Sequence, residues 1–237
     1  MGDVSRETIA APDPDVAARV FPSGLSVLAR YAALLAGDGV TRGLIGPREV
    51  PRLWDRHLIN CGLLAPLVPA RATVVDLGSG AGLPGIVLAI ARPDLQVTLV
   101  EPMARRVAFL DEVRAELTLD NVTVLRERAE QWRDAPTFAV VTARALAPLP
   151  KLLSWGLPLL APGGTLLAMK GASAASEVEA AAGELRRWRA SAEVVTRAVA
   201  DSSATVVRVV RDPEAEIGWP STSARSAGRR RRRREHG

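Results

Sequence analysis

Cysteine is almost absent from this chain of 237 residues, which contains Cys61 and no other. One cysteine cannot form an internal disulfide, so a reducing, cytoplasmic compartment is expected. Long apolar runs are also missing, because no segment approaches the roughly 20 residues that a membrane-spanning helix needs. The chain opens without a signal peptide. These absences predict a cytoplasmic protein with no membrane segment.

Lysine is scarce as well: Lys151 and Lys170 stand against a large excess of arginine, and the net charge is +5. Three of these five positive charges fall after Arg211, where Pro, Ser, Ala and Gly lead into the run Arg229 to Arg234. Such a segment cannot form a core, so residues 212–237 are predicted to be a disordered, arginine-rich tail. The rest of the chain is nearly neutral, and its net charge does not indicate a nucleic-acid partner.

The most informative stretch is TVVDLGSGAGLPG, from Thr73 to Gly85, which predicts a strand, a glycine loop and a helix. Glycines let the backbone turn sharply and let a ligand lie against the main chain. Pro84 suits the first turn of the following helix, because its missing N–H costs nothing there. A ligand is therefore expected at the carboxyl end of this strand.

The identity of that ligand depends on Asp76. Gly80, Gly82 and Gly85 also fit the G-x-G-x-x-G spacing of dinucleotide-binding folds, but a carboxylate at the strand end would repel a pyrophosphate. S-adenosylmethionine has no phosphate and carries an ammonium and a sulfonium, which a carboxylate suits. We predict S-adenosylmethionine as the cofactor, with Asp76, Gly78 and Gly80 at its site. An NAD(P)-dependent oxidoreductase is the alternative, and titration with both ligands separates the two.

Short apolar strands alternate with helices after this point, which indicates an α/β fold with a doubly wound, mostly parallel sheet. The expected strands are 73–76, 96–100, 122–125, 138–142 and 165–169, followed by an antiparallel pair at 192–199 and 205–211. Seven strands fit a Rossmann-like class I methyltransferase. Helical spacing of apolar residues predicts three helices before the sheet. The expected parts are an N-terminal helical cap (1–70), a methyltransferase domain (71–211) and the tail (212–237).

Several polar residues fall where predicted strands end. Glu101 follows the second strand, at the offset where such folds place an acid that accepts hydrogen bonds from ribose hydroxyls. Ala129 and Glu130 follow the third strand, where an adenine ring would lie and where an amide and a carboxylate can recognise it. Arg144 and Lys170 follow the fourth and fifth strands at the same edge, and both are candidates for contacts with the substrate.

Residue types that several kinds of methyl transfer require are absent near these strand ends, which reduces the number of possible methyl-acceptor atoms. Methylation at C5 of a pyrimidine needs a cysteine nucleophile, and Cys61 falls in the cap, away from the strand ends. Methylation of an exocyclic amine usually uses Asn or Asp followed by two prolines, but TARA occupies residues 142–145, and arginine cannot accept a hydrogen bond. Transfer to a ribose hydroxyl usually uses lysines, for which Lys170 is a candidate.

His57 lies on an apolar stripe without a Ser, Cys or carboxylate arrangement to activate, so we expect a structural role.

Methylation at guanine N7 asks less of the protein, because N7 presents a lone pair and carries no proton to remove. Catalysis is then mostly placement of that lone pair in line with the sulfonium methyl group. Arg144 would hold O6, a phosphate or the cofactor, since N7 must stay free. The deep major groove of A-form RNA hides this edge, so the target base is expected in a loop or turned out.

Six short runs point to one family: LWDRHL at 53–58, DLGSGAGLPG at 76–85, RRVAFL at 105–110, RAE at 128–130, ARA at 143–145 and MKG at 169–171. Together they closely resemble the RsmG family, also called GidB, bacterial methyltransferases that act on N7 of one guanosine in 16S ribosomal RNA. The resemblance covers roughly residues 20–211. It implies that Gly78, Leu83, Ala129, Glu130 and Arg144 line the S-adenosylmethionine pocket, and that 16S rRNA or the small ribosomal subunit is the partner of a monomer.

A noncatalytic RNA-binding or ribosome-assembly protein is an alternative from another class. The basic tail is compatible with it. Activity that does not depend on the cofactor would distinguish it from a methyltransferase.

Deletion of residues 225–237 tests whether the run Arg229 to Arg234 contacts ribosomal RNA. If it does, the deletion weakens RNA binding at low salt and lowers the slope of log affinity against log salt by roughly 0.7 to 0.9 per lost phosphate contact. RNA affinity is measured across a salt series for the full and shortened chains, with S-adenosylmethionine affinity as the control that stays constant. Parallel lines would show that the tail does not engage RNA.

Overall fold

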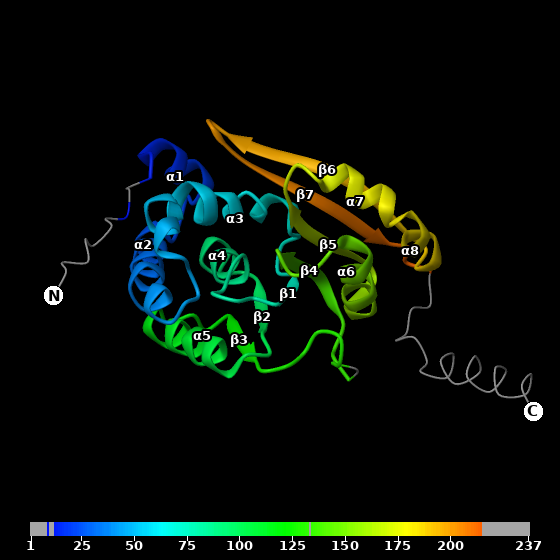
Figure 1. The fold of residues 1–237 in the computed structure, drawn as a ribbon, viewed down its shortest axis with the longest axis horizontal. Helices are drawn as coiled ribbons and strands as arrows, with labels where there is room; N and C mark the ends of the chain where they lie inside the picture. Colours follow the sequence, from blue (N-terminus) through cyan, green and yellow to red (C-terminus); the bar gives the residue numbers. More distant parts are fainter. Residues whose placement is uncertain (1–8, 10–11, 133, 215–237) are drawn as a thin grey trace, which may run out of the picture.

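The computed structural model describes residue 9 and residues 12–132 and 134–214, so the arginine run 229–234 lies outside the described residues. At its centre is a seven-stranded sheet in the order β3-β2-β1-β4-β5-β7-β6 (Figure 1). Only β7 runs against its neighbours β5 and β6. The predicted seven-stranded, mostly parallel sheet is confirmed.

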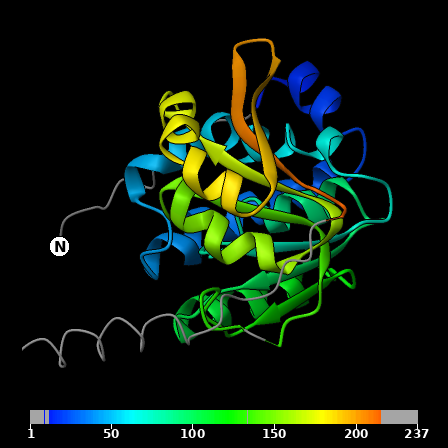
Figure 2. The same cartoon turned by 90° about the vertical axis from the view of Figure 1, so that its right-hand side faces the viewer.

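The strands are β1 (Thr73–Leu77), β2 (Gln96–Val100), β3 (Val122–Leu125), β4 (Phe138–Arg144), β5 (Leu160–Lys170), β6 (Ala190–Val199) and β7 (Ser202–Arg211). The hairpin of β6 and β7 extends beyond the body of the sheet, in orange in Figure 2. The start of β5 differs from the sequence prediction, because its pairing with β4 skips from Leu160 to Thr165. The four residues between them loop out as an irregularity inside one long strand.

Within the described residues, seven short helical segments precede the sheet: α1 (Pro14–Val20), α2 (Leu25–Leu34), η1 (Leu35–Gly39), η2 (Pro47–Arg52), η3 (Leu53–Ile59), α3 (Asn60–Gly62) and η4 (Ala65–Leu67). Asp13 caps α1, since its side chain accepts from the N–H groups of Asp15 and Val16. The third helix expected from the sequence is a run of 3₁₀, π and α turns. Pro51 lies inside its 3₁₀ part and lacks the N–H that a regular α-helix would use.

The helices after β1 are α4 (Gly85–Ala91), α5 (Ala104–Glu116), α6 (Leu149–Gly156), η5 (Leu157–Leu159), α7 (Ala174–Ala180) and α8 (Ala182–Arg187). One expectation needs correction, because Pro84 caps α4 and does not lie in its first turn. The helical region after β5 is divided at Ala181 into α7 and α8.

Each face of the sheet carries its own hydrophobic cluster, and alternate residues of β1 show the division. Val74 packs with the cap, α4 and α5, whereas Val75 and Leu77 pack with α6, α7 and α8. Figure 1 shows the two groups of helices on opposite sides of the sheet. Tyr31 of the cap is fully buried in the first cluster, so the cap and the sheet share one core.

The strand order reverses between β1 and β4, because the chain runs outward from β1 through β2 to β3 and from β4 in the other direction. The two strands pair in parallel, with Leu77 opposite Ala143. In open α/β sheets this reversal leaves a ligand crevice at the carboxyl ends of the strands. The residues that follow Leu77 and Ala143 are therefore the first candidates for a site.

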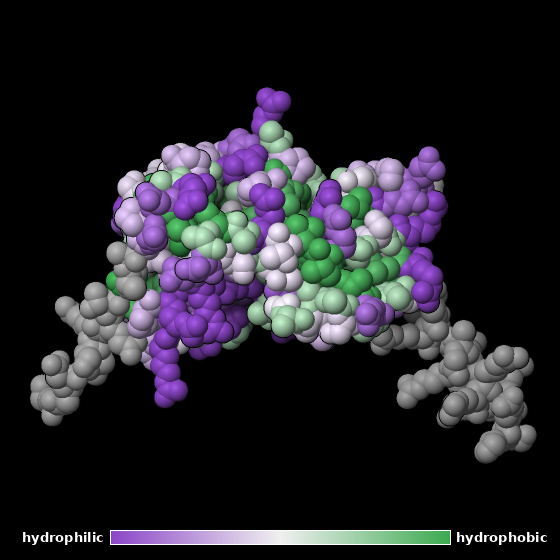
Figure 3. Space-filling model, turned by 90° about the horizontal axis from the view of Figure 1, so that it is seen from above, coloured by the Kyte–Doolittle hydropathy of each residue, from purple (hydrophilic) through white to green (hydrophobic). Residues whose placement is uncertain are grey.

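The face of the described residues that Figure 3 shows is mixed in polarity. Among these residues, the exposed large apolar side chains are Met103, at 39% exposure, and Val194, at 43%. In the described ranges no single helix is long and apolar enough to cross a membrane. One pair bent by 107°, Pro14–Val20 with Leu25–Gly39, passes that test jointly by length and composition.

Gly156→Ala should destabilise the contact between α6 and the sheet. A Cβ there would lie 2.5 Å from Cδ1 of Leu166 and 3.3 Å from Cγ1 of Val141, and such overpacking costs about 1–3 kcal/mol. The matched control is Gly183→Ala in α8, where a Cβ meets no atom within 4 Å. Urea unfolding measures both, and equal stabilities of the two variants would contradict the packing described here.

Candidate active site

The loop after β1 turns through three glycines with positive φ: Gly78 at 65°, Gly80 at 59° and Gly82 at 101°. Residues with a Cβ rarely adopt this conformation. The N–H of Gly78 donates to the last carbonyl of β2 at 2.8 Å. From the cap, the Tyr31 hydroxyl donates to the carbonyl of Ala81 at 2.7 Å. The glycine loop is therefore held by the neighbouring strand and by the cap at once.

Asp76 lies inside the protein near the end of β1, and its side chain hydrogen-bonds to the end of the glycine loop. Its side chain is fully buried, and its two oxygens accept from the N–H of Gly85 at 3.1 Å and from the hydroxyl of Thr142 at 3.0 Å. Burial raises the pKa of this carboxyl to about 7. The structure thus joins β1, α4 and β4 through Asp76, while its predicted contact with the cofactor stays a prediction.

Glu101 lies beside the glycine loop at the end of β2 and is 1% exposed. Its oxygens accept from the N–H groups of Gly80 and Met103, both at 3.0 Å, and Nη1 of Arg106 lies 3.5 Å away. Because a carboxylate has about four lone-pair positions, these contacts leave acceptor capacity. The structure places Glu101 where a ribose ligand is predicted.

Ala129 and Glu130 lie in the turn after β3, further along the same edge of the sheet. Ala129 is 6% exposed, and the carboxylate of Glu130 lies 3.8 Å from the guanidinium of Arg128. The N–H of Gln131 donates to the carbonyl of Arg128 at 2.8 Å and closes the turn. Contact of this turn with an adenine ring stays a prediction.

Arg144 is the last residue of β4, and its guanidinium reaches into the cap. Nη1 donates to Sγ of Cys61 at 3.3 Å, and Nη2 donates to the carbonyl of Arg56 at 3.3 Å. The expectation that Cys61 lies away from the strand ends is therefore wrong, because the cap folds back over the end of β4. Burial raises the pKa of the Cys61 thiol to about 11, so it stays protonated and is not a nucleophile near neutral pH.

His57 also lies at this strand end, which sequence analysis did not predict. Its Nδ1 is 2.8 Å from Nη2 of Arg144, and its Nε2 is 2.8 Å from Oε2 of Glu49. The expectation that no carboxylate lies near His57 is wrong. Glu49 precedes it by eight residues, and the irregular turns of η2 and η3 bring the two side chains together.

Lys170 ends β5 and holds the connection that follows β4. Its ammonium donates to the carbonyl of Ala147 at 2.8 Å and pairs with Glu177 of α7 at 2.7 Å. Burial alone would raise the pKa of Glu177, but the hydrogen bonds from Lys170 and from the N–H of Leu149 outweigh it, and this pKa is lowered. With its side chain 10% exposed, Lys170 serves this connection, and a contact with substrate stays a prediction.

Leu146 is a further residue that sequence analysis missed. A Cβ built on Gly78 would lie 2.5 Å from Cδ1 of Leu146, so the Leu146 side chain covers the glycine. A ligand that contacts the bare backbone of Gly78 would therefore displace one flexible apolar side chain. The absence of a Cβ at Gly78 is compatible with close approach of a ligand, and contact with the methionine part of S-adenosylmethionine stays a prediction.

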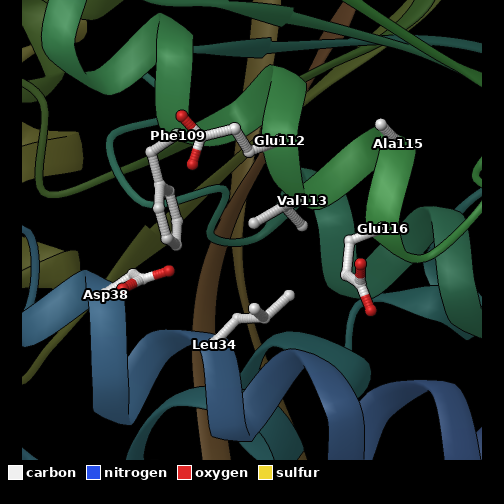
Figure 4. Close-up of a pocket in the computed structure, with 7 residues that line it drawn as sticks. All are labelled: Leu34, Asp38, Phe109, Glu112, Val113, Ala115 and Glu116. Carbon is white, nitrogen blue, oxygen red and sulfur yellow. The ribbon is translucent and has the colours of Figure 1, made fainter.

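A pocket of ≈ 500 Å³ lies elsewhere, between the cap and α5 (Figure 4). Its lining residues are Leu34, Asp38, Phe109, Glu112, Val113, Ala115 and Glu116. None of them is a predicted site residue. Two ion pairs link the cap to the α5 residues of this lining, Arg30 to Glu116 at 2.9 Å and Arg42 to Glu112 at 2.6 Å.

Comparison with known proteins identifies the family. The sequence profile of GidB, rRNA small subunit methyltransferase G, matches residues 25–207. The chain belongs to this family. Ribosomal RNA small subunit methyltransferase G of Nocardioides sp. is 58% identical over 99% of this chain and 94% of the relative. The protein of the same name from Thermobifida fusca is 54% identical over 92% and 95%.

Solved structures agree on the fold of this GidB family member. A methyltransferase from Pyrococcus furiosus matches with a TM-score of 0.53 at 13% identity, over 63% of this chain and 80% of that one. Precorrin-6y C5,15-methyltransferase from Geobacter metallireducens matches with a TM-score of 0.51 at 16% identity, over 71% and 90%. The predicted Rossmann-like methyltransferase fold is confirmed. The GidB family consists of S-adenosylmethionine-dependent methyltransferases, and S-adenosylmethionine is the cofactor.

Gly78→Ala tests the space over the glycine loop. A left-handed backbone costs a residue with a Cβ about 1–2 kcal/mol, and the added methyl would lie 2.5 Å from Cδ1 of Leu146. If Gly78 contacts the cofactor as predicted, S-adenosylmethionine affinity should fall at least about tenfold. Gly43→Ala is the control, because Gly43 has φ 67° and an added Cβ there would meet no atom within 4 Å. Calorimetry on the two folded variants decides: equal, unchanged affinity would remove Gly78 from the site.

Proposed function

We propose that this chain transfers a methyl group from S-adenosylmethionine to N7 of one guanosine in the 16S rRNA of the small ribosomal subunit. The family match over residues 25–207 carries the proposal. It is supported by the glycine loop and Arg144, which meet where the strand order reverses. We propose further that the chain acts in the cytoplasm as a monomer, with residues 1–70 as a cap and 71–211 as the methyltransferase domain.

The predicted ligand contacts divide along the carboxyl edge of the sheet. Gly78, Gly80 and Leu83 would hold the methionine part of the cofactor, and Glu101 would accept from its ribose. Ala129 and Glu130, after β3, would hold its adenine. When bound, the cofactor supplies an electrophilic methyl group on a sulfonium.

The side chains at the end of β4 favour N7 over other acceptor atoms. Cys61 stays a thiol, so the covalent route to C5 of a pyrimidine has no nucleophile there. Arg144 only donates and cannot accept from an exocyclic amine. The ammonium of Lys170 is paired with Glu177, which opposes its use in ionising a ribose hydroxyl. Guanine N7 needs none of these groups, because its lone pair requires only placement.

Small ribosomal subunits from cells that lack the chain provide the test. Incubation with the protein and labelled S-adenosylmethionine should place label in 16S rRNA, recovered as N7-methylguanosine at one position. NAD(P)H titration is the control and should show no binding. Label on a ribose or an exocyclic amine, or no label although the cofactor binds, would contradict the proposal.

A further inference from the structure

Three side chains from three elements form a continuous line at the end of β4: Glu49 of η2, His57 of η3 and Arg144. We propose that Glu49 and His57 are positioning residues that fix the guanidinium of Arg144 beside the guanosine and the cofactor. The inference rests on the proposed function for the role of Arg144. The arrangement of the three side chains rests on their contacts alone.

The chemistry of arginine determines where the protons lie. Arg144 donates through all its N–H groups and accepts nothing, so Nδ1 of His57, 2.8 Å from Nη2, must present its lone pair. The imidazole then carries its proton on Nε2, 2.8 Å from a carboxylate oxygen of Glu49 that accepts it. Glu49 thereby fixes the tautomer of His57 that Arg144 requires.

Burial and charge keep His57 in this neutral form. Burial first, and Arg144 second, lower its pKa from the ordinary 6.5, although Glu49 acts in the opposite sense. The hydrogen bond from His57 is the main cause of a lowered pKa at Glu49. The His57 side chain is 12% exposed, against 30% for Glu49. Along the line, exposure therefore decreases from Glu49 to His57.

The guanidinium has donors to spare for a ligand. Its contacts with His57, the carbonyl of Arg56 and the sulfur of Cys61 use three of its five N–H groups. Each of these partners belongs to the cap, so the cap sets the direction in which the remaining donors point. A guanidinium held on one side in this way loses less conformational entropy when a phosphate or guanine O6 arrives.

Protonation of His57 would undo the arrangement. A proton on Nδ1 would face the N–H of Arg144 and place two cations in contact. The charged groups that act on His57 are Glu49 from η2, Arg144 from β4 and Arg56 from its own segment, with Arg52 acting on Glu49. Because the pKa of His57 is lowered, the part of turnover that depends on His57 should be constant above about pH 6.5 and fall as the pH drops through that lowered pKa.

Two amide substitutions separate the two ends of the imidazole. The amide oxygen of His57→Asn lies near the position of Nδ1 and still accepts from Arg144, whereas the amide of His57→Gln lies near Nε2 and contacts only Glu49. We expect kcat of His57→Asn within about threefold of wild type, without the acid-side fall, and kcat of His57→Gln lowered about tenfold or more. KM for S-adenosylmethionine should stay unchanged in both.

A double variant shows whether His57 acts through Arg144. If it does, His57→Gln in the background of Arg144→Ala should lower kcat no further, because the side chain that it positions is already gone. Glu193→Ala, which breaks the exposed pair with Arg208, is the control for loss of a surface ion pair and should keep full turnover. Additive losses, or equal activity of the Asn and Gln variants, would overturn the proposal.

The proton arrangement can be measured without any substrate. The chain has only two histidines, His57 and His236, so nitrogen-15 NMR of labelled histidine resolves both rings. The expected spectrum shows His57 as the neutral Nε2–H tautomer at pH 7, lost in Arg144→Ala. A charged ring or the Nδ1–H tautomer would overturn the proposal. If the spectrum agrees but ribosomal RNA is not methylated, the proposed function fails and the geometry stands.

Discussion

Parallel pairing of β1 with β4 is the constraint on which the rest of the site depends. Hydrogen bonds between these two central strands place Leu77 opposite Ala143, and the next residues on each strand are Gly78 and Arg144. A bare backbone and a guanidinium are thereby brought to one edge from positions far apart in the sequence. Neither needs a flexible loop to hold it, so the geometry has the rigidity of the sheet.

The N-terminal cap contributes hydrogen bonds to the residues at the carboxyl edge of the sheet. Tyr31 hydrogen-bonds to the glycine loop, and His57 and Cys61 contact Arg144. The cap shares its hydrophobic cluster with α4 and α5. This packing fixes the position of the cap, and with it the side chains that make these polar contacts. The N-terminal residues therefore help to shape both the predicted cofactor side and the predicted base side of the site.

Much of the fold could be predicted from the sequence, because the spacing of apolar residues and the local composition indicate the strands, helices and loops. The glycine loop, Glu101 after β2 and the antiparallel pair at the end of the sheet follow from local patterns. The surroundings of Arg144 could not be predicted in this way. Contacts between Cys61 or His57 and β4 depend on how the cap folds back over the sheet, across more than 80 residues of sequence. Glu49 meets His57 through irregular 3₁₀ and π turns, which regular helical spacing does not anticipate.

The connection that carries Leu146 is fastened on both sides. Arg144 is held by the cap, and Ala147 and Leu149 are held by Lys170 and Glu177. A ligand that enters over Gly78 therefore meets one movable side chain on an anchored span of backbone. Rotamer changes of single side chains occur in picoseconds to nanoseconds, whereas loops take far longer to rearrange. Passage of a ligand over Gly78 would then require a rotamer change of Leu146, and the backbone of its connection need not rearrange.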